Sequence, residues 1–176
     1  MPDLQLALLR SAEWHLGQER DGDHPLPYLT HPVEVLVNLR YVGGVTDPVQ
    51  LCAAALHDVL EETAVQADSI REQFGDEVAA MVMELTRYEP SDEERAGLSA
   101  DEIWALRSRL LLDEIAQMSP RAQAVKLADR LSNLRESKRT KGKKKLDRYL
   151  GQTKEILRIV PREVNPGLWD AIKAEL

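Results

Sequence analysis

The sequence predicts an all-α fold, and two observations carry that prediction. Apolar residues recur every three or four positions along most of the chain, the period of a helix with one buried face, and they almost nowhere alternate as in a half-buried strand. Residues that start or stop helices, chiefly Ser, Asp, Gly and Pro, stand at the ends of these stretches. With 176 residues, 43% of them hydrophobic, the chain is long enough for one domain with a substantial core.

The helices expected in the first half begin with a helix over residues 4–16, followed by a loop rich in Gly and Pro. Thr30 is the expected cap of a second helix, which the glycines 43 and 44 close. Asp47 and Pro48 open a third helix, apolar on most sides, which runs on through residues 57 and 58.

In the second half, a short helix over residues 68–74 ends at Gly75, and another follows over 76–85. Residues 89–97 are polar and predict an exposed loop. Ser99 has capping-box spacing to Glu102 and begins a helix to about residue 118; Ser119 and Pro120 begin the next, to about residue 136. Two further helices are expected, one over 146–160 and a short one opened by residues 165 and 166.

Composition narrows the classes of function. A net charge of −7 argues against a general nucleic-acid binder, because the phosphate backbone would be repelled. The N-terminal residues lack the pattern of a secretory signal, and no apolar run approaches the ~20 residues that cross a bilayer. We therefore expect a cytoplasmic protein with no membrane partner. The single cysteine, Cys52, is expected to be an inert packed thiol.

The adjacent pair His57 and Asp58 is the most informative feature of the chain. It stands in an apolar helix, and Glu61 and Glu62 follow one turn later. Burying unpaired carboxylates costs several kcal/mol or forces their protonation, so such a cluster needs a compensating cation. A divalent metal is the natural candidate, although an acidic pair such as Glu61-Glu62 is more often a solvated helix end.

Two other places carry residues of the same chemistry. His31 stands at a helix start, and Asp129 lies one turn before Asn133 and close to Lys126. Each has an ordinary alternative: a lone histidine is usually a surface or satisfied residue, and Asp129 could simply pair with Arg130 or Lys126. The argument for a functional site comes from the combination.

Four segments together resemble the HD-domain hydrolases of guanosine tetraphosphate and pentaphosphate. They are Thr-His-Pro (30–32), Leu-His-Asp-Val-Leu-Glu-Glu-Thr (56–63), Phe-Gly-Asp-Glu-Val (74–78) and Val-Lys-Leu-Ala-Asp-Arg-Leu-Ser-Asn-Leu-Arg (125–135). The similarity spans about residues 12–157. It implies a helical HD bundle, with residues 1–176 as a single metal-dependent phosphohydrolase domain. It also implies one Mn²⁺ ion, held by His31, His57, Asp58 and Asp129.

The reaction that the resemblance implies is metal-assisted hydrolysis of the 3′-pyrophosphate, leaving GDP or GTP. Glu61 and Glu62 would be the catalytic carboxylates that orient the attacking water and take its proton. The family has Glu-Asp at this pair, so Glu62 adds one methylene. A displacement of ~1 Å can cost ~100-fold in rate, so reduced activity or altered substrate preference is one expectation.

The resemblance also assigns nucleotide contacts. Arg20 would pack on the guanine ring, Asn133 would hold the ribose, and Lys126 would contact a phosphate. Asp21 stands where the family often adds a basic residue. Ser132 replaces a bulkier ring-bearing residue, which is expected to open the pocket or remove a contact.

Several alternatives stay open. The run Lys138–Lys145 carries six positive charges, which either gather an anionic nucleotide or form a solvated flexible loop. The preferred function is a stand-alone alarmone hydrolase whose partner is a small guanine nucleotide. A hydrolase of another nucleotide, including a phosphate of NADPH, and a non-catalytic HD protein that binds a nucleotide or a partner are the alternatives. The sequence does not give the oligomeric state or the metal's identity.

Overall fold

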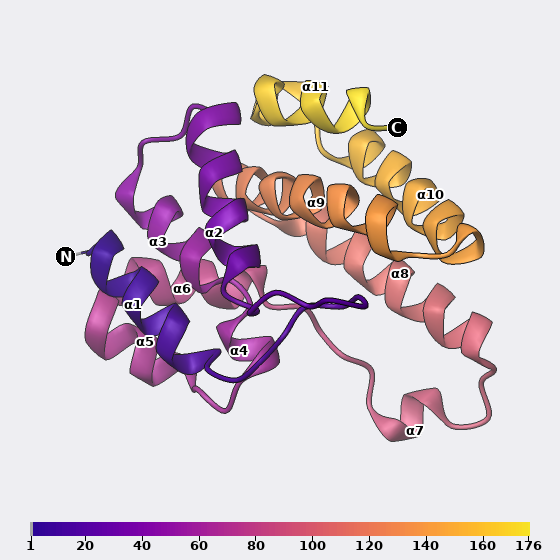
Figure 1. Cartoon of the computed structure of the whole chain (residues 1–176), viewed down its shortest axis with the longest axis horizontal. Coiled ribbons are helices and arrows are strands. Elements are labelled where there is room, and N and C mark those ends of the chain that lie inside the picture. The colour runs from indigo at the N-terminus through magenta and orange to yellow at the C-terminus, as the bar shows by residue number, and fades with distance from the viewer. Residues whose placement is uncertain (1) are drawn as a thin grey trace.

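The computed structural model describes residues 2–176, which form helices with an isolated β-bridge between Glu19 and Pro27 (Figure 1). The elements of the first half are α1 (Leu4–Trp14), α2 (Thr30–Val37), the π-helical turn η1 (Asn38–Val42), α3 (Pro48–Leu56), α4 (Val59–Glu62), α5 (Ala67–Phe74) and α6 (Asp76–Leu85). Those of the second half are α7 (Asp92–Arg95), α8 (Ala100–Gln117), α9 (Pro120–Thr140), α10 (Lys143–Ile159), the 3-10 turn η2 (Arg162–Val164) and α11 (Pro166–Ala174). The prediction of an all-α protein is confirmed.

Helix α3 lies at the centre of the core, and every residue from Val49 to Leu56 is buried. Helices α1, α2, α6 and α9 pack around it. The alanines at positions 53–55 are fully buried, and their small side chains let the neighbouring helices approach closely. Cys52 is also fully buried, as predicted, and burial raises the pKa of its thiol to about 11. No helix within residues 2–176 is both long and apolar enough to cross a membrane.

Helix α9 joins the two halves of the molecule. It packs against α2, α3 and α6 and also against α10 and α11 (Figure 1). Leu127, Leu131 and Leu134 form its fully buried stripe, and burying a leucine side chain contributes about 1.5–3 kcal/mol. Side chains on the neighbouring face of α9 are thereby held beside the ends of α2 and α3.

Local capping explains why four helices begin where the sequence predicts. Asp47 accepts a hydrogen bond from the Val49 amide, Ser119 from Ala122 and Asn165 from Leu168. Ser99 and Glu102 form the predicted capping box before α8. Each side chain satisfies an amide that the first turn leaves without a helical partner.

Two predictions in the N-terminal region are wrong. The first helix ends at Trp14, and Leu16 lies beyond it with 85% of its surface exposed. Thr30 does not cap α2: it is the first helical residue, and its hydroxyl donates to the Pro27 carbonyl at 2.9 Å. Thr30 therefore lies inside the first turn, and the flanking N-cap position is occupied by Leu29, which makes no side-chain cap hydrogen bond.

Three expectations for the second half also differ from the structure. The expected loop over 89–97 contains α7, which Ser91 and Glu94 stabilise with a capping box. Helix α9 continues past Glu136 to Thr140, so the basic run belongs to the end of α9 and the start of α10. The interpretation of this run as a flexible loop is wrong. Lys138 donates to Glu175 at 2.7 Å and Lys143 to Asp147 at 2.6 Å.

Candidate metal centre and cleft

His57 and Asp58 occupy a break in the helix that the sequence predicts to be continuous. Helix α3 ends at Leu56 and α4 begins at Val59, with Asp58 at φ −95° and ψ −5°. Successive residues of an unbroken helix point about 100° apart. At this break both side chains reach the same point, with His57 Nε2 3.1 Å from Asp58 Oδ1.

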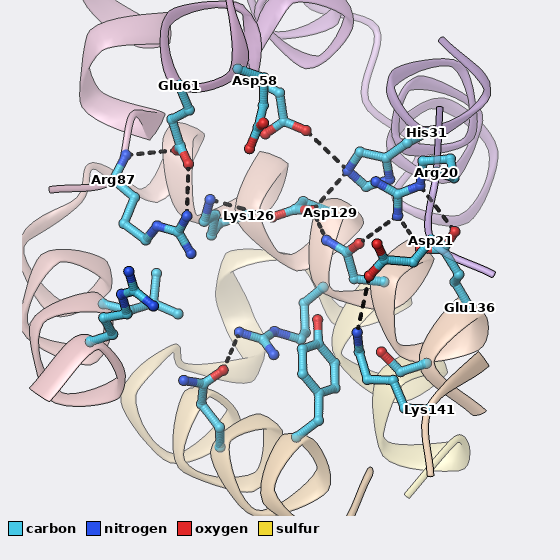
Figure 2. Close-up of a pocket in the computed structure, with 18 of the residues that line it drawn as sticks. Arg20, Asp21, His31, Asp58, Glu61, Arg87, Lys126, Asp129, Glu136 and Lys141 are labelled. Carbon is cyan, nitrogen blue, oxygen red and sulfur yellow. Dashed lines mark hydrogen bonds and ion pairs between the residues drawn. The ribbon is translucent and has the colours of Figure 1, made fainter. Parts of the chain in front are cut away.

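The four predicted ligands converge although they come from three separate segments. The possible metal-ligand atoms of His31, His57 and Asp129 all lie within 4.8 Å of one another. His31 Nε2 is 3.3 Å from Asp129 Oδ1 and 3.4 Å from Asp58 Oδ2, so Asp58 completes the group (Figure 2). His31 comes from the start of α2, His57 and Asp58 from the α3–α4 break, and Asp129 from α9.

The hydrogen bonds of His31 fix which of its nitrogens carries the proton. The Ser132 hydroxyl donates its only hydrogen to Glu34 Oε2 at 2.8 Å, so its oxygen can only accept from His31 Nδ1 at 3.1 Å. In the neutral ring, Nε2 then has a free lone pair, and this lone pair faces the two carboxylates. Ser132 is buried and hydrogen-bonded to His31 and Glu34, and the expectation that a serine here opens the pocket or removes a contact stays a prediction.

His57 has the same arrangement with a different partner. Its Nδ1 lies 2.9 Å from the Ala54 carbonyl, which can only accept a hydrogen bond, and burial lowers the pKa of the imidazole so that the ring is neutral. The buried Nε2 has no hydrogen-bond partner within residues 2–176. Two imidazole nitrogens and two carboxylates therefore face one point, and the His57 nitrogen there has no hydrogen-bond donor or acceptor partner among the described residues. Such an all-acceptor cluster fits a divalent cation.

Lys126 lies beside this cluster. Its ammonium is 3.3 Å from Asp129 Oδ2, and 11% of the side chain is exposed. Burial alone would raise the pKa of Asp129, but the neighbouring Lys126 ammonium holds it well below its usual range. The ordinary alternative for Asp129, a pair with Lys126, is thus present. Lys126 pairs with Oδ2 of Asp129, whereas the two imidazoles lie nearest Oδ1.

The cluster lies in a cleft of about 560 Å³ between the N-terminal loop, α4, α8, α9 and α10 (Figure 2). Most of the lining side chains are charged. The cations are Arg20, Arg87, Arg107, Lys126, Arg130 and Lys141, and the anions are Glu19, Asp21, Asp58, Glu61, Glu62, Asp129 and Glu136. Such a lining suits a ligand with several anionic groups that also needs a metal.

The two predicted catalytic carboxylates differ in their surroundings. Glu61 accepts the Arg87 amide at 2.7 Å, and its other oxygen lies 3.4 Å from the Arg87 guanidinium. Burial raises the pKa of Glu61, although Lys126 and the two Arg87 contacts act to lower it. Glu62 is exposed and lines the cleft. Of the two adjacent glutamates, Glu61 is therefore held by Arg87 and Glu62 is accessible from the cleft.

The predicted nucleotide contacts form a connected group. Arg20 donates through Nη2 to Asn133 Oδ1 at 3.0 Å and through Nε to Glu136 at 3.0 Å. Asn133 in turn donates to Asp129. Asp21 lies 3.8 Å from Lys141, so a cation of the basic run stands beside the position where the resemblance leads one to expect a basic residue.

Sequence reasoning missed three residues of the site. Tyr28 donates to Asp58, Glu136 holds Arg20, and Arg87 holds Glu61. Tyr28 stands one turn before His31, a spacing that could have placed it on the same side. The partners of Glu136 and Arg87 lie far away in sequence, and no local pattern reveals them.

Comparison with known proteins identifies the family. The model of the HD domain matches residues 7–156, which is most of the chain. The chain belongs to the HD-domain family.

Relatives of this HD domain include hydrolases of known name. Over 129 residues it is 36% identical to the guanosine-3′,5′-bis(diphosphate) 3′-pyrophosphohydrolases MESH1 of Xenopus tropicalis and Homo sapiens, covering 73% of this chain and 66% of each relative. The chain thus spans just under two thirds of those proteins. It is also 34% identical over 164 residues to a GTP pyrophosphokinase of Streptomyces coelicolor, covering 88% of this chain and 18% of the relative.

Solved structures agree with the HD assignment. A structure described as a metazoan ortholog of SpoT that hydrolyzes ppGpp superposes with a TM-score of 0.84 at 28% identity, covering 98% of this chain and 92% of that one. A Listeria monocytogenes EGD-e protein superposes with a TM-score of 0.62 at 24% identity, which shows the shared fold alone. The predicted HD-domain helical bundle is confirmed.

Proposed function

We propose that residues 1–176 act as a single HD-type phosphohydrolase domain on guanosine tetraphosphate or pentaphosphate. The products are pyrophosphate and GDP or GTP. The observation that carries this proposal is the convergence of two imidazole nitrogens and two carboxylates, all acceptors, in a charged cleft. The names of the MESH1 relatives and of the superposed SpoT ortholog support the substrate class.

The ion we propose is Mn²⁺, held by His31, His57, Asp58 and Asp129. Mixed imidazole and carboxylate donors suit manganese, although other divalent ions accept the same set. When bound, the ion supplies Lewis-acid polarisation of the phosphate and lowers the pKa of water.

The protein's own carboxylates handle the proton. Water attacks the phosphorus attached to the ribose 3′ oxygen, and the exposed Glu62 carboxylate accepts the proton that the water loses. The bond from phosphorus to the 3′ oxygen breaks, and the proton returns to that oxygen. Glu61 holds the Arg87 guanidinium at the cleft, where its charge stabilises the departing pyrophosphate.

The nucleotide is oriented by Arg20 and Asn133. Glu136 contacts Arg20 through the edge of the guanidinium, at Nε and Nη2, which leaves a planar face for the guanine ring. Asn133 is placed for the ribose, and Lys126 for a phosphate. We further propose that the protein works in the cytoplasm on this small molecule, without nucleic-acid or membrane partners, because its net charge of −7 repels anionic surfaces.

The test is pyrophosphate release from guanosine tetraphosphate by the purified protein with Mn²⁺. We expect release by the wild type and its loss in Asp58→Ala. Asp113→Ala removes an exposed carboxylate from α8 outside the cleft lining and should behave as the wild type. NADPH and other nucleotides, assayed in parallel, distinguish substrates within the same chemistry.

A wild-type protein that binds Mn²⁺ but releases nothing from the guanosine nucleotides would refute the proposed substrate. If it acts on NADPH instead, the hydrolase assignment survives and the nucleotide changes. If it acts on none, a non-catalytic HD protein is the remaining function.

A further inference from the structure

Tyr28 contacts both the metal cluster and the predicted nucleotide side of the cleft. It lies in the loop between α1 and α2 and lines the cleft. Its hydroxyl donates to Asp58 Oδ2 at 2.7 Å. Its ring meets the His31 ring edge to face, with centroids 6.2 Å apart. Two of the four proposed metal ligands therefore touch this one side chain.

Two further side chains contact the Tyr28 ring. His15 stacks on the ring with centroids 4.6 Å apart and an interplanar angle of 23°. The Arg20 guanidinium lies 5.3 Å from the ring centroid. A cation over an aromatic face is attracted by the ring quadrupole. His15 and Arg20 thus both contact the Tyr28 ring, and Arg20 in turn donates to Glu136.

The backbone holds these three side chains in place. The Tyr28 amide donates to the Gln18 carbonyl at 2.9 Å, and the Arg20 amide donates to the Leu26 carbonyl at 2.9 Å, so the two chain segments pair as a short ribbon. Gln18 also donates through Nε2 to the Glu62 carbonyl at 2.6 Å. The ribbon is therefore tied to the segment that carries the proposed proton acceptor.

We infer that Tyr28 is a positioning residue with two separable roles. Its hydroxyl orients Asp58 toward the metal, and its ring supports Arg20 for stacking on the base of the nucleotide. The inference rests on the proposed function, because it takes a metal and a guanine nucleotide as the ligands. Hydrogen bonds to a ligating carboxylate commonly fix its orientation, and their removal weakens metal binding by about 10–100-fold.

The two roles can be tested with two substitutions. Tyr28→Phe keeps the ring and removes the hydroxyl, so we expect Mn²⁺ to bind ~10-fold more weakly while GDP binds the Mn²⁺-saturated protein unchanged. Tyr28→Ala removes both, so GDP binding should also weaken, by ~3-fold or more. Both affinities are measured by calorimetry on the full chain, with circular dichroism as the check of folding.

Arg20→Ala is the complementary control, since it should weaken GDP binding without changing the Mn²⁺ affinity. Unchanged Mn²⁺ affinity in Tyr28→Phe overturns the first role. Equal loss of both affinities in Tyr28→Phe and Tyr28→Ala overturns the separation of roles. Wild-type pyrophosphate release is measured in the same series: its absence refutes the proposed function, whereas the Mn²⁺ comparison still decides the role of the hydroxyl.

Discussion

The two imidazoles of the cluster are oriented by partners of different kinds. His57 is held by a backbone carbonyl, which no side-chain substitution removes. His31 is held by Ser132, whose hydroxyl depends in turn on Glu34. Partners of this kind fix the tautomer and ring orientation of a metal ligand. The His31 side of the centre is therefore the one that a single distant substitution can weaken.

Ser132→Ala should lower the affinity for Mn²⁺ by ~10-fold, because His31 Nδ1 loses its acceptor and the ring can adopt the other tautomer. Titration calorimetry with the apo protein measures this. Ser11→Ala is the matched control, since Ser11 is a buried serine on α1 whose hydroxyl has no partner among the described residues. Equal Mn²⁺ affinity in both variants would contradict the role of Ser132.

Glu62→Gln should lower kcat by ~100-fold and leave Mn²⁺ binding unchanged, because the amide cannot accept a proton and Glu62 is outside the metal cluster. Glu62→Asp keeps a carboxylate and should retain most of the turnover that Glu62→Gln loses. Steady-state pyrophosphate release measures both, with Glu72→Gln on the exposed side of α5 as the charge control. Normal turnover by Glu62→Gln would show that another group takes the proton.

At the scale of elements, the breaks between helices orient the residues of the site as much as the helices do. The α3–α4 break aims His57 and Asp58 at one point. A second sharp connection joins α5 to α6 at Gly75, whose φ of +88° and ψ of 170° are open to glycine alone without strain. The α5–α6 pair packs through this corner.

Gly75→Ala should lower the free energy of unfolding by ~1–3 kcal/mol, since a Cβ would be strained at this φ although nothing lies within 4 Å of it. Gly151→Ala should change the free energy of unfolding in the opposite direction. Gly151 is exposed inside α10 with open space around it, so alanine should stabilise the protein by ~0.5–1 kcal/mol. Urea unfolding of both variants checks this, and destabilisation by both would contradict the conformational explanation.

Element starts were predictable where the determining interaction is local. Asp47, Ser99 and Ser119 cap the helix that directly follows them, so the necessary information lies within four residues. Boundaries set by distant contacts were not predictable. Helix α9 reaches Thr140 where Lys138 pairs with Glu175, a residue at the far end of the chain.

The same distinction separates the predicted part of the site from the missed part. The sequence pattern around His57 and Asp58, together with its resemblance to a known family, predicted the residues of the metal cluster. It did not reveal the helix break, because propensity alone favours continuing an alanine-rich helix. Nor did it reveal that Arg87 holds Glu61, since that pairing requires the ends of α4 and α6 to meet.

At the scale of the whole molecule, the cleft draws on segments from residue 19 to residue 152. The mutual repulsion of Asp58 and Asp129 is a cost that the folded protein carries without a metal. Burial of this pair at the junction of α2, α3 and α9 therefore links the metal to the stability of the entire fold.

Mn²⁺ should raise the free energy of unfolding by about 2.7 kcal/mol at a concentration 100 times its Kd, because it binds the folded chain alone. Thermal unfolding with excess Mn²⁺ and with EDTA measures the difference. In Asp129→Ala the ion should have no effect on the melting temperature. A metal-dependent shift of the same size in that variant would show that the ion binds elsewhere.

His31 and Asp129 are separated by nearly a hundred residues. A chain being synthesised from its N-terminus carries His31, His57 and Asp58 long before Asp129 and the rest of α9 leave the ribosome. The nascent protein consequently lacks one of the four proposed ligands until α9 has been synthesised. The proposed ion can therefore be held by the full set only after this helix has packed against α2 and α3.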